Sequence, residues 1–206
     1  MRPVVVGIAG GTGSGKSTVV QGILRGLDPI RVAHLAHDRY YRDLSHLPLE
    51  ERARRNFDHP DALETDLLVE HLDRLRGGER VVPPAYDFGT HCRLPGGEAV
   101  DPAPVVIVEG VLILVDTELR RRLDLRVFVD TDADVRLARR LRRDLHERGR
   151  SPGSVLRQYE QTVRPMHLAF VEPSRRHAHL ILPEGGFNAA GLEMLVGSIR
   201  SRVAQG

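Results

Sequence analysis

The chain of 206 residues contains one cysteine, Cys92, no tryptophan, and only five phenylalanines and four tyrosines. A single cysteine excludes an intramolecular disulfide and a cysteine-based metal cluster. No stretch approaches the roughly 20 apolar residues of a membrane-spanning helix, and no signal-type segment precedes the first apolar run. A formal net charge of +2 is close to balance and gives no argument for a nucleic-acid partner. We therefore expect a cytoplasmic protein that binds neither membrane nor nucleic acid.

Lysine is also scarce, because Lys16 is the only one and every other cationic side chain is arginine. It stands in a glycine-rich segment that reads Gly10, Gly11, Thr12, Gly13, Ser14, Gly15, Lys16 and Ser17. Two glycines with four residues between them, followed by Lys and Ser, form the Walker A pattern of phosphate-binding loops. An apolar run at 4–9 precedes the pattern, and apolar residues at helical spacing follow it, which predicts the strand–loop–helix context that such a loop needs.

The glycines allow successive backbone N–H groups to turn around a phosphate, and the following helix adds the positive end of its dipole. We predict that Lys16 reaches the β- and γ-phosphates of a nucleotide and that Ser17 offers its hydroxyl to Mg²⁺. Thr18 completes the predicted nucleotide-binding segment. The alternative is a glycine-rich turn that only joins two core elements.

Strand-like apolar runs recur along the chain at 4–9, 32–36, 105–108, 127–129 and 180–182. Helical patterns lie between most of them, and such alternation predicts a single α/β domain over 1–206, with a parallel sheet and helices on both faces. Ligands of such folds bind at the carboxyl ends of the strands. The residues that follow each strand are therefore the first candidates for a site.

Two acidic residues stand at such strand ends. Asp38 follows the second strand and is suited to accept the proton of a hydroxyl that attacks a phosphate, or to hold Mg²⁺ through water. A helix cap or turn aspartate is an equally good interpretation. Glu109 ends the third strand in a Walker B-like position that predicts a carboxylate near Mg²⁺, although a strand-end Glu can also cap a neighbouring helix.

Residues 79–102 interrupt the alternation and predict a β-hairpin insertion that turns at Gly96-Gly97. Between its arms lie Tyr86, Phe88, His91 and Arg93. Rings concentrated on an insertion favour a stacking surface for a flat ligand, and a small satellite core is the alternative.

Earlier in the chain, Phe57 stands beside Asp58. A ring next to a carboxylate is suited to binding a base and a sugar, and the alternative is a turn in which the ring only packs and the carboxylate only caps.

After the fourth strand, Asp130-Thr131-Asp132 is predicted to start and cap a helix. The apolar side of that helix is Val135, Ala138, Leu141 and Leu145, and the arginines are Arg136, Arg140 and Arg143, with Arg148 and Arg150 beyond. Guanidiniums near a phosphate loop would neutralise charge on a transferred phosphoryl group, although most of them could form a solvated face paired with Asp144 and Glu147. A second polar helix with Gln158 is predicted to run toward Pro165 as a mobile cover.

In these residues the chain resembles the uridine kinases (uridine-cytidine kinases), a family of P-loop kinases, over nearly its whole length. The segments that carry the resemblance are 10–17, 38–42, 56–62, 86–88, 109–110, 139–144, 147–150 and 158–159. The Walker A pattern alone would indicate only a nucleotide-binding class. The Asn-Phe-Asp-His-Pro-Asp and Tyr-Asp-Phe segments, in this order and spacing, are far more specific.

The resemblance implies a P-loop NTPase fold with a five-stranded parallel sheet, a β-hairpin insertion at about 79–102 and a helical lid at about 131–168. It implies ATP-dependent phosphorylation of the 5′-hydroxyl of uridine and cytidine to UMP and CMP, a step of pyrimidine salvage. ATP is the expected phosphate donor, GTP is an alternative donor, and Mg²⁺ is the expected metal. Because relatives often form tetramers, a homo-oligomer is expected.

The resemblance also assigns roles. Asp38 is the base on the 5′-hydroxyl, and Asp58 and Arg140 hold the 2′- and 3′-hydroxyls. The other nucleoside contacts fall on Tyr41, Phe57, Tyr86, Phe88, His91 and Gln158. The groups that act with Asp38 in catalysis are Lys16, Arg143, which also helps to hold the nucleoside, and Arg148, which meets the ATP phosphates. The metal side is formed by Ser17 and Glu109.

Neutral histidine can bond either the uracil or the cytosine edge by changing which ring nitrogen carries the proton, so His91 leads us to expect both bases.

Two other functions fit the motifs. One is a P-loop kinase for another hydroxylated substrate, such as pantothenate, ribulose phosphate or nicotinamide riboside. The other is a nucleotide-gated switch; a guanine-reading Asn-Lys-x-Asp segment is excluded, because no lysine follows Lys16.

Overall fold

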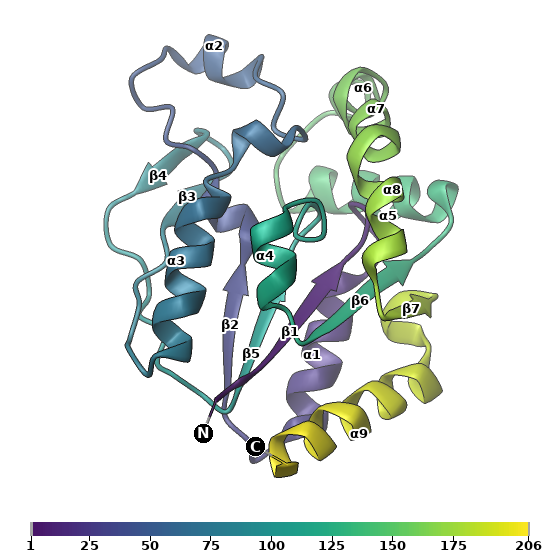
Figure 1. The fold of residues 1–206 in the computed structure, drawn as a ribbon. Coiled ribbons are helices and arrows are strands. Elements are labelled where there is room, and N and C mark those ends of the chain that lie inside the picture. Colours follow the sequence, from purple (N-terminus) through teal and green to yellow (C-terminus); the bar gives the residue numbers. More distant parts are fainter. Residues whose placement is uncertain (1, 206) are drawn as a thin grey trace.

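The computed structural model describes residues 2–205, and a five-stranded parallel sheet runs through its centre (Figure 1). Its strands, in the spatial order β2-β5-β1-β6-β7, span Val32–Ala36, Val105–Glu109, Val4–Ala9, Leu125–Asp130 and Leu180–Pro183. The five apolar runs of the sequence are these strands, so the predicted parallel sheet is confirmed. After β1 the chain forms β2 and β5 on one side of it, and then β6 and β7 on the other side. The carboxyl end of β1 is therefore the switch point at which such folds bind ligands.

Helices cover both faces of the sheet (Figure 1). One face carries α1 (Lys16–Leu27) and α9 (Ala189–Gln205), and the other carries α3 (Thr65–Arg76) and α4 (Thr117–Arg122). Side chains alternate along each strand, so that Val5 packs under α3 and α4 while Val6 packs under α1 and α9. Because both faces are buried, the strands read as continuous apolar runs.

The short charged helix α2 (Leu49–Ala53) lies away from the sheet, at the top of Figure 1. The last helix of the described chain, α9, packs against α1. Between residues 2 and 205, no helix combines the length and the apolar character that crossing a membrane requires.

The predicted hairpin insertion is confirmed, but its turn lies elsewhere. β3 (Ala85–Asp87) pairs antiparallel with β4 (Cys92–Leu94), and the chain reverses at 88–91 instead of Gly96-Gly97. The reason is Asp87, whose carboxylate accepts hydrogen bonds from the Gly89 N–H (2.8 Å) and the Thr90 hydroxyl (2.7 Å). Gly96, with a φ of 78°, makes a second bend.

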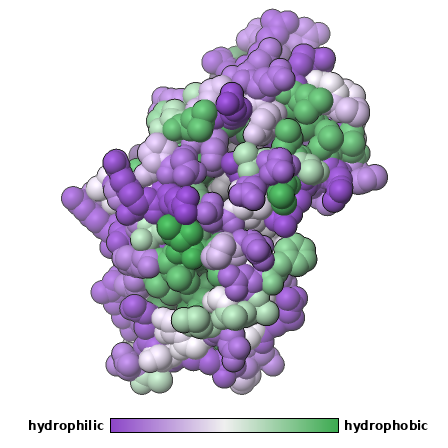
Figure 2. Space-filling model, turned by 90° about the vertical axis from the view of Figure 1, so that its right-hand side faces the viewer, coloured by the Kyte–Doolittle hydropathy of each residue, from purple (hydrophilic) through white to green (hydrophobic). Residues whose placement is uncertain are grey.

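Helix α5 (Ala133–His146) begins after β6 as predicted, but its apolar side is not its buried side. Arg136, Arg140 and Asp144 are buried, whereas Val135 and Ala138 are exposed. The charged side faces inward because it lies against the phosphate loop. Figure 2 shows the side of the molecule that carries α5, where hydrophobic residues gather in patches between hydrophilic ones.

The predicted cap of α5 is only half correct. Asp132 stands at the N-cap position, but within the described chain its side chain makes no capping hydrogen bond. Asp130 instead pairs with Arg175 at 2.9 Å. The end of β6 is therefore tied to the helix that precedes β7.

The second polar helix does not stop near Pro165. α6 (Pro152–Gln158) continues through a π turn at Tyr159–Val163, α7 (Arg164–Met166), a π turn at His167–Val171, α8 (Glu172–Ser174) and a 3₁₀ turn at Arg175–His177. We call this run, 152–177, the long helix. Each π turn directly precedes a helical segment with proline, Pro165 or Pro173. Proline has no N–H and its ring clashes with the carbonyl four residues earlier, so the wide turns let the helix pass both prolines.

Candidate active site

The phosphate loop lies at the carboxyl end of β1, between β5 and β6. Gly10, Gly13 and Gly15 all have positive φ, at 146°, 75° and 94°, which favours glycine. Gly15 is the N-cap of α1, and since glycine has no side chain, the first N–H groups of the helix stay available to an anion. The loop therefore has the backbone form that the Walker A pattern predicts.

Lys16 is buried against this loop and donates hydrogen bonds to the Gly10 carbonyl (3.1 Å) and the Gly11 carbonyl (3.2 Å). Burial lowers the pKa of Lys16, although the charges of Glu109 and Asp38 act in the opposite direction. A buried ammonium that bonds carbonyl groups instead of a carboxylate is costly unless an anion joins it. Its surroundings fit a bound phosphate.

Replacing Gly13 with alanine should lower nucleotide affinity by about tenfold or more and destabilise the fold by about 2 kcal/mol, because a non-glycine residue is strained at this φ. The new Cβ would lie 2.3 Å from the Arg136 carbonyl oxygen, so α5 must move away from the loop. Nucleotide titration and denaturant unfolding measure both effects.

The matched control is Gly197→Ala, a site in α9 with open space around it. Alanine there should be neutral or stabilising by about 0.5–1 kcal/mol. Equal nucleotide affinity in wild type and Gly13→Ala would show that α5 does not need its close approach to the loop.

The predicted metal side is brought together. The Ser17 hydroxyl donates to Glu109 Oε1 at 2.9 Å, and the other oxygen of that carboxylate lies 3.6 Å from His34 Nε2. Burial raises the pKa of Glu109, but the nearby His34 ring, the charge of Lys16 and the bond from Ser17 outweigh it, so the pKa lies below its usual value. Glu109 is accordingly an anion.

A hydroxyl beside an ionised carboxylate is a hard oxygen donor set that suits Mg²⁺. Among residues 2–205 no three His, Cys, Asp or Glu side chains gather as a complete metal site. Mg²⁺ in phosphoryl-transfer sites is commonly held by one or two protein oxygens together with substrate phosphates. Ser17 and Glu109 fit that arrangement, and they would hold the ion beside the phosphate loop.

Asp38 lies in the 3₁₀ turn His37–Tyr40, directly after β2. Ala36 is the N-cap of this turn, so Asp38 is not its cap. Solvent reaches the side chain, yet the protein around it and the charge of Glu109 raise the pKa of Asp38, and Lys16 lowers it. The structure thus brings Asp38 within electrostatic reach of both the phosphate loop and the predicted metal side.

Asp58 and Arg140, the predicted sugar contacts, are also near each other. Asp58 Oδ2 accepts a hydrogen bond from Thr162 of the long helix (2.8 Å), and Arg140 donates to Thr12 of the phosphate loop (3.1 Å) and to Gln158 (2.8 Å). Burial holds the pKa of Asp58 above its usual value, although the Thr162 bond and the charge of Arg140 act in the opposite direction. The Thr162 hydroxyl occupies one of the hydrogen-bonding positions that a sugar hydroxyl would use.

A cavity of about 20 Å³ lies beside Asp58, between the phosphate loop and the long helix; it is lined by Thr12, Asp58, Val111, Val163, Met166, His167 and Val171. Such a volume holds about one water molecule. A sugar can enter this space only if the long helix moves away from the phosphate loop.

The predicted ring residues form one cluster. Phe57 and His91 are stacked with centroids 4.6 Å apart and an interplanar angle of 15°. The ring centroid of Tyr41 lies 5.5 Å from that of Phe57 and 5.2 Å from that of Tyr86. The Tyr86 and Phe88 centroids are 5.3 Å apart. The guanidinium carbon of Arg148 lies 4.7 Å from the Phe88 centroid. At this ring cluster the hairpin therefore contacts the residues that follow α5.

Five further residues contact the candidate site and were not predicted as part of it: Asp144, Arg136, Arg150, Thr162 and His167. Arg136 and Arg150 belong to the predicted arginine series, so their charge was a usable signal. Thr162 and His167 gave none, because only the path of the long helix brings them to Asp58 and the phosphate loop.

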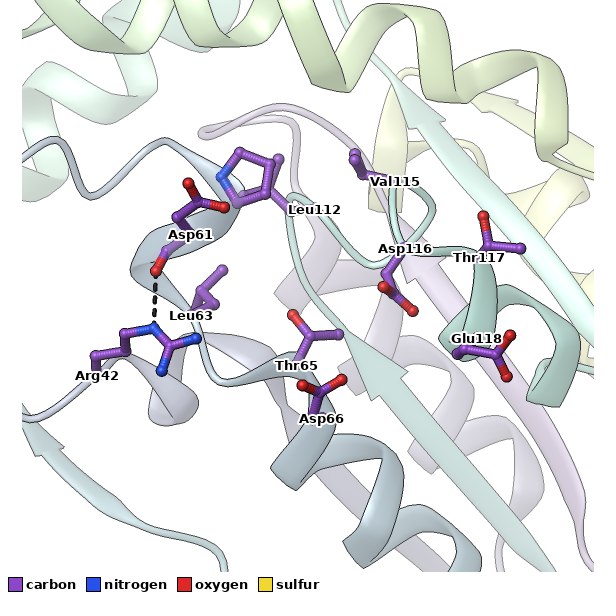
Figure 3. Close-up of a pocket in the computed structure, with 11 residues that line it drawn as sticks. Arg42, Asp61, Leu63, Thr65, Asp66, Leu112, Val115, Asp116, Thr117 and Glu118 are labelled. Atoms are coloured by element: carbon purple, nitrogen blue, oxygen red, sulfur yellow. Dashed lines mark hydrogen bonds between the residues drawn. The ribbon is translucent and has the colours of Figure 1, made fainter.

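A separate cavity of about 390 Å³ lies between the start of α3 and the β5–α4 connection (Figure 3). Asp61, Asp66, Asp116 and Glu118 are among its lining residues, and Arg42 donates to the Asp61 carbonyl at 2.9 Å. None of the predicted site residues lines it. Its volume alone does not make it the place of the chemistry.

The sequence model of the phosphoribulokinase / uridine kinase family matches residues 5–190. Among similar proteins, the uridine kinase of Chloroflexus aggregans is 57% identical over 200 residues, 97% of this chain and 96% of the relative. The uridine kinase of Clostridium tetani is 50% identical over 202 residues, 98% of this chain and 97% of the relative. Among solved structures, phosphoribulokinase from Rhodobacter spheroides shares the fold with a TM-score of 0.61 and 15% identity, over 88% of this chain and 70% of that one.

Proposed function

The chain belongs to the phosphoribulokinase / uridine kinase family, and we propose that it phosphorylates the 5′-hydroxyl of uridine and cytidine with ATP, giving UMP and CMP for pyrimidine salvage. GTP is an alternative donor. The observation that carries the proposal is the position of Asp38, whose charge acts on Lys16 in the phosphate loop and also on Tyr41 in the ring cluster. A carboxylate within electrostatic reach of both a phosphate site and a cluster of rings suits a nucleoside kinase.

In the proposed reaction Asp38 accepts the proton of the 5′-hydroxyl as its oxygen attacks the γ-phosphate. Lys16, Arg143 and Arg148 supply positive charge where negative charge develops. Mg²⁺ held beside Ser17 and Glu109 would neutralise phosphate charge. Closure of the long helix would exclude water from the transferred group.

The proposed base site of the acceptor is the ring cluster. The Tyr86 hydroxyl is buried and, among the described residues, has no hydrogen-bond partner, so a ligand could supply one. Burial and the charge of Arg150 lower the pKa of His91, which keeps its ring neutral. A neutral imidazole can donate or accept, in agreement with acceptance of both uracil and cytosine.

The proposed base site of the donor is on the opposite side of the phosphate loop. Phe187 is 75% exposed, and the Arg139 guanidinium lies 5.3 Å from its ring centroid. The turn Gly185–Phe187 runs beside Gly15. A planar cation and an exposed ring at this place suit stacking on a purine.

Replacing Asp58 with alanine should lower kcat/KM for uridine by about 10–100-fold, the effect of losing hydrogen bonds to a charged group. The loss for 2′-deoxyuridine should be smaller, because that substrate has no 2′-hydroxyl to lose. Steady-state kinetics on both substrates test this. Asp61→Ala, three residues further along the chain and exposed, is the control and should change neither value. Equal losses on both substrates would show that Asp58 does not read the sugar.

The proposed function is tested by a coupled ADP-release assay across uridine, cytidine, their deoxy forms and adenosine. We expect turnover with uridine and cytidine above all. Pantothenate, ribulose phosphate and nicotinamide riboside in the same assay test the other kinase functions. Tight ATP binding with no ADP release stimulated by any of these compounds would favour a nucleotide-gated switch.

A further inference from the structure

Asp144 lies on the inward side of α5 and is fully buried, surrounded by four arginines. Oδ1 accepts hydrogen bonds from Arg143 Nε (3.0 Å) and Nη2 (2.8 Å). Arg140 Nε and Arg150 Nη1 each lie 3.6 Å from Oδ2, and Arg148 Nη1 lies 3.8 Å from Oδ1. One carboxylate thus holds together four like charges.

The four arginines lead to different parts of the molecule. Arg140 reaches Thr12 in the phosphate loop. Arg148 lies over Phe88 in the hairpin. Arg150 donates to Gln158 and, at 3.0 Å, to the Ser154 hydroxyl, both in the long helix. Asp144 is therefore the shared partner of side chains that contact the phosphate loop, the hairpin and the long helix.

We infer that Asp144 is the positioning residue that sets the donor-side and acceptor-side arginines relative to each other, although it touches neither substrate. The inference rests on the proposed function, in which Arg148 meets the donor phosphates and Arg140 and Arg143 hold the nucleoside. Asp144 acts through these guanidiniums. Without its charge they repel one another, and each leaves the place where it contacts substrate.

Two observations support this role over that of a simple structural ion pair. Burial lowers the pKa of Arg140, and Asp144 is the largest of the charges that oppose this, so the guanidinium depends on that carboxylate for its stability. Within residues 2–205, Asp144 Oδ2 and Arg140 Nε are buried without a hydrogen-bond partner. Buried polar groups are rarely left unpaired. We therefore expect the 3.6 Å distance between these two atoms to shorten to a hydrogen bond when the site closes around substrate.

The test is Asp144→Asn, which keeps the shape of the side chain and removes its charge, with Glu147→Gln as the matched control. Glu147 is exposed just after α5, and its variant should match wild type. For Asp144→Asn we expect kcat/KM to fall by about 100-fold, the loss expected when reacting groups are misplaced by about 1 Å, with kcat lowered and the nucleoside KM raised. The Kd of a non-hydrolysable ATP analogue, titrated with Mg²⁺ and no acceptor, should also rise.

A purely structural role would lower Tm and leave kcat, KM and Kd unchanged below the transition, and that result would overturn the inference. If Asp144→Asn does not fold, Asp144→Glu decides: its charge should restore folding, and its extra methylene should leave the arginines displaced and kcat/KM reduced. Wild-type kinetics in Asp144→Glu would also overturn the inference. The analogue titration needs no acceptor, so a wild-type protein that fails to phosphorylate nucleosides would refute the proposed function and leave this test in force.

Discussion

Replacing Asp38 with asparagine should lower kcat for nucleoside phosphorylation by about 10³-fold, within the range of about 10²–10⁴ that general bases contribute. Asparagine keeps the size of the side chain and its hydrogen-bonding oxygen, but it cannot accept a proton from the hydroxyl. The Kd for uridine should therefore stay close to that of wild type. The coupled ADP-release assay gives kcat, and calorimetric titration of uridine gives the Kd.

The pH profile gives an independent reading of the same residue. The protein around Asp38 and the charge of Glu109 raise the pKa of Asp38. Only the ionised carboxylate accepts a proton, so activity should be lost as the pH falls through this raised pKa. Because kcat/KM reports the free enzyme, its acid limb in wild type should lie above the usual range of an aspartate, and Asp38→Asn should lack that limb.

The control for both measurements is Asp66→Asn. Asp66 is an exposed carboxylate at the start of α3 that lines the separate cavity, and its variant should keep the wild-type kcat and acid limb. Near-normal turnover of Asp38→Asn would remove Asp38 from the role of base. The carboxylate would then have to act by binding the substrate.

The sheet and the phosphate loop could be predicted because their signals are local. A strand buried on both faces must be apolar throughout, so Val4–Ala9 and Val105–Glu109 are visible as short apolar runs. A loop that wraps a phosphate needs glycine where φ is positive, as at Gly13 and Gly15, and these positions recur at fixed spacing. Neither signal depends on distant parts of the chain.

The orientation of α5 and the course of the long helix could not be predicted, because distant parts of the chain decide them. Apolar periodicity marks Val135 as a core residue, yet the phosphate loop lies against the opposite side of the helix and buries Arg136 instead. Pro165 reads as a helix end, but π turns let the chain pass it. The bond between Thr162 and Asp58 joins residues 104 positions apart, and no pattern at that distance marks it.

Replacing Lys16 with arginine should lower kcat/KM by about 10²–10³-fold even though the charge is kept, which is the loss typical when one contact to transition-state charge is removed. Lysine presents a compact ammonium, whereas arginine presents a planar fork that needs more room. The ammonium fits between the Gly10 and Gly11 carbonyls at 3.1 and 3.2 Å. The Arg136 guanidinium already lies against Gly11, so a second guanidinium would crowd the loop.

The measurement is kcat/KM for ATP at saturating uridine, together with the Kd of the ATP analogue. Arg25→Lys makes the reverse exchange at an exposed position of α1, so it controls for a general effect of exchanging these cations, and it should match wild type. If Lys16→Arg turned over normally, charge alone would be enough at this position. The only lysine of the chain would then have no geometric reason to be there, and the buried ammonium would lose its place in the proposed stabilisation of the transferred phosphoryl group.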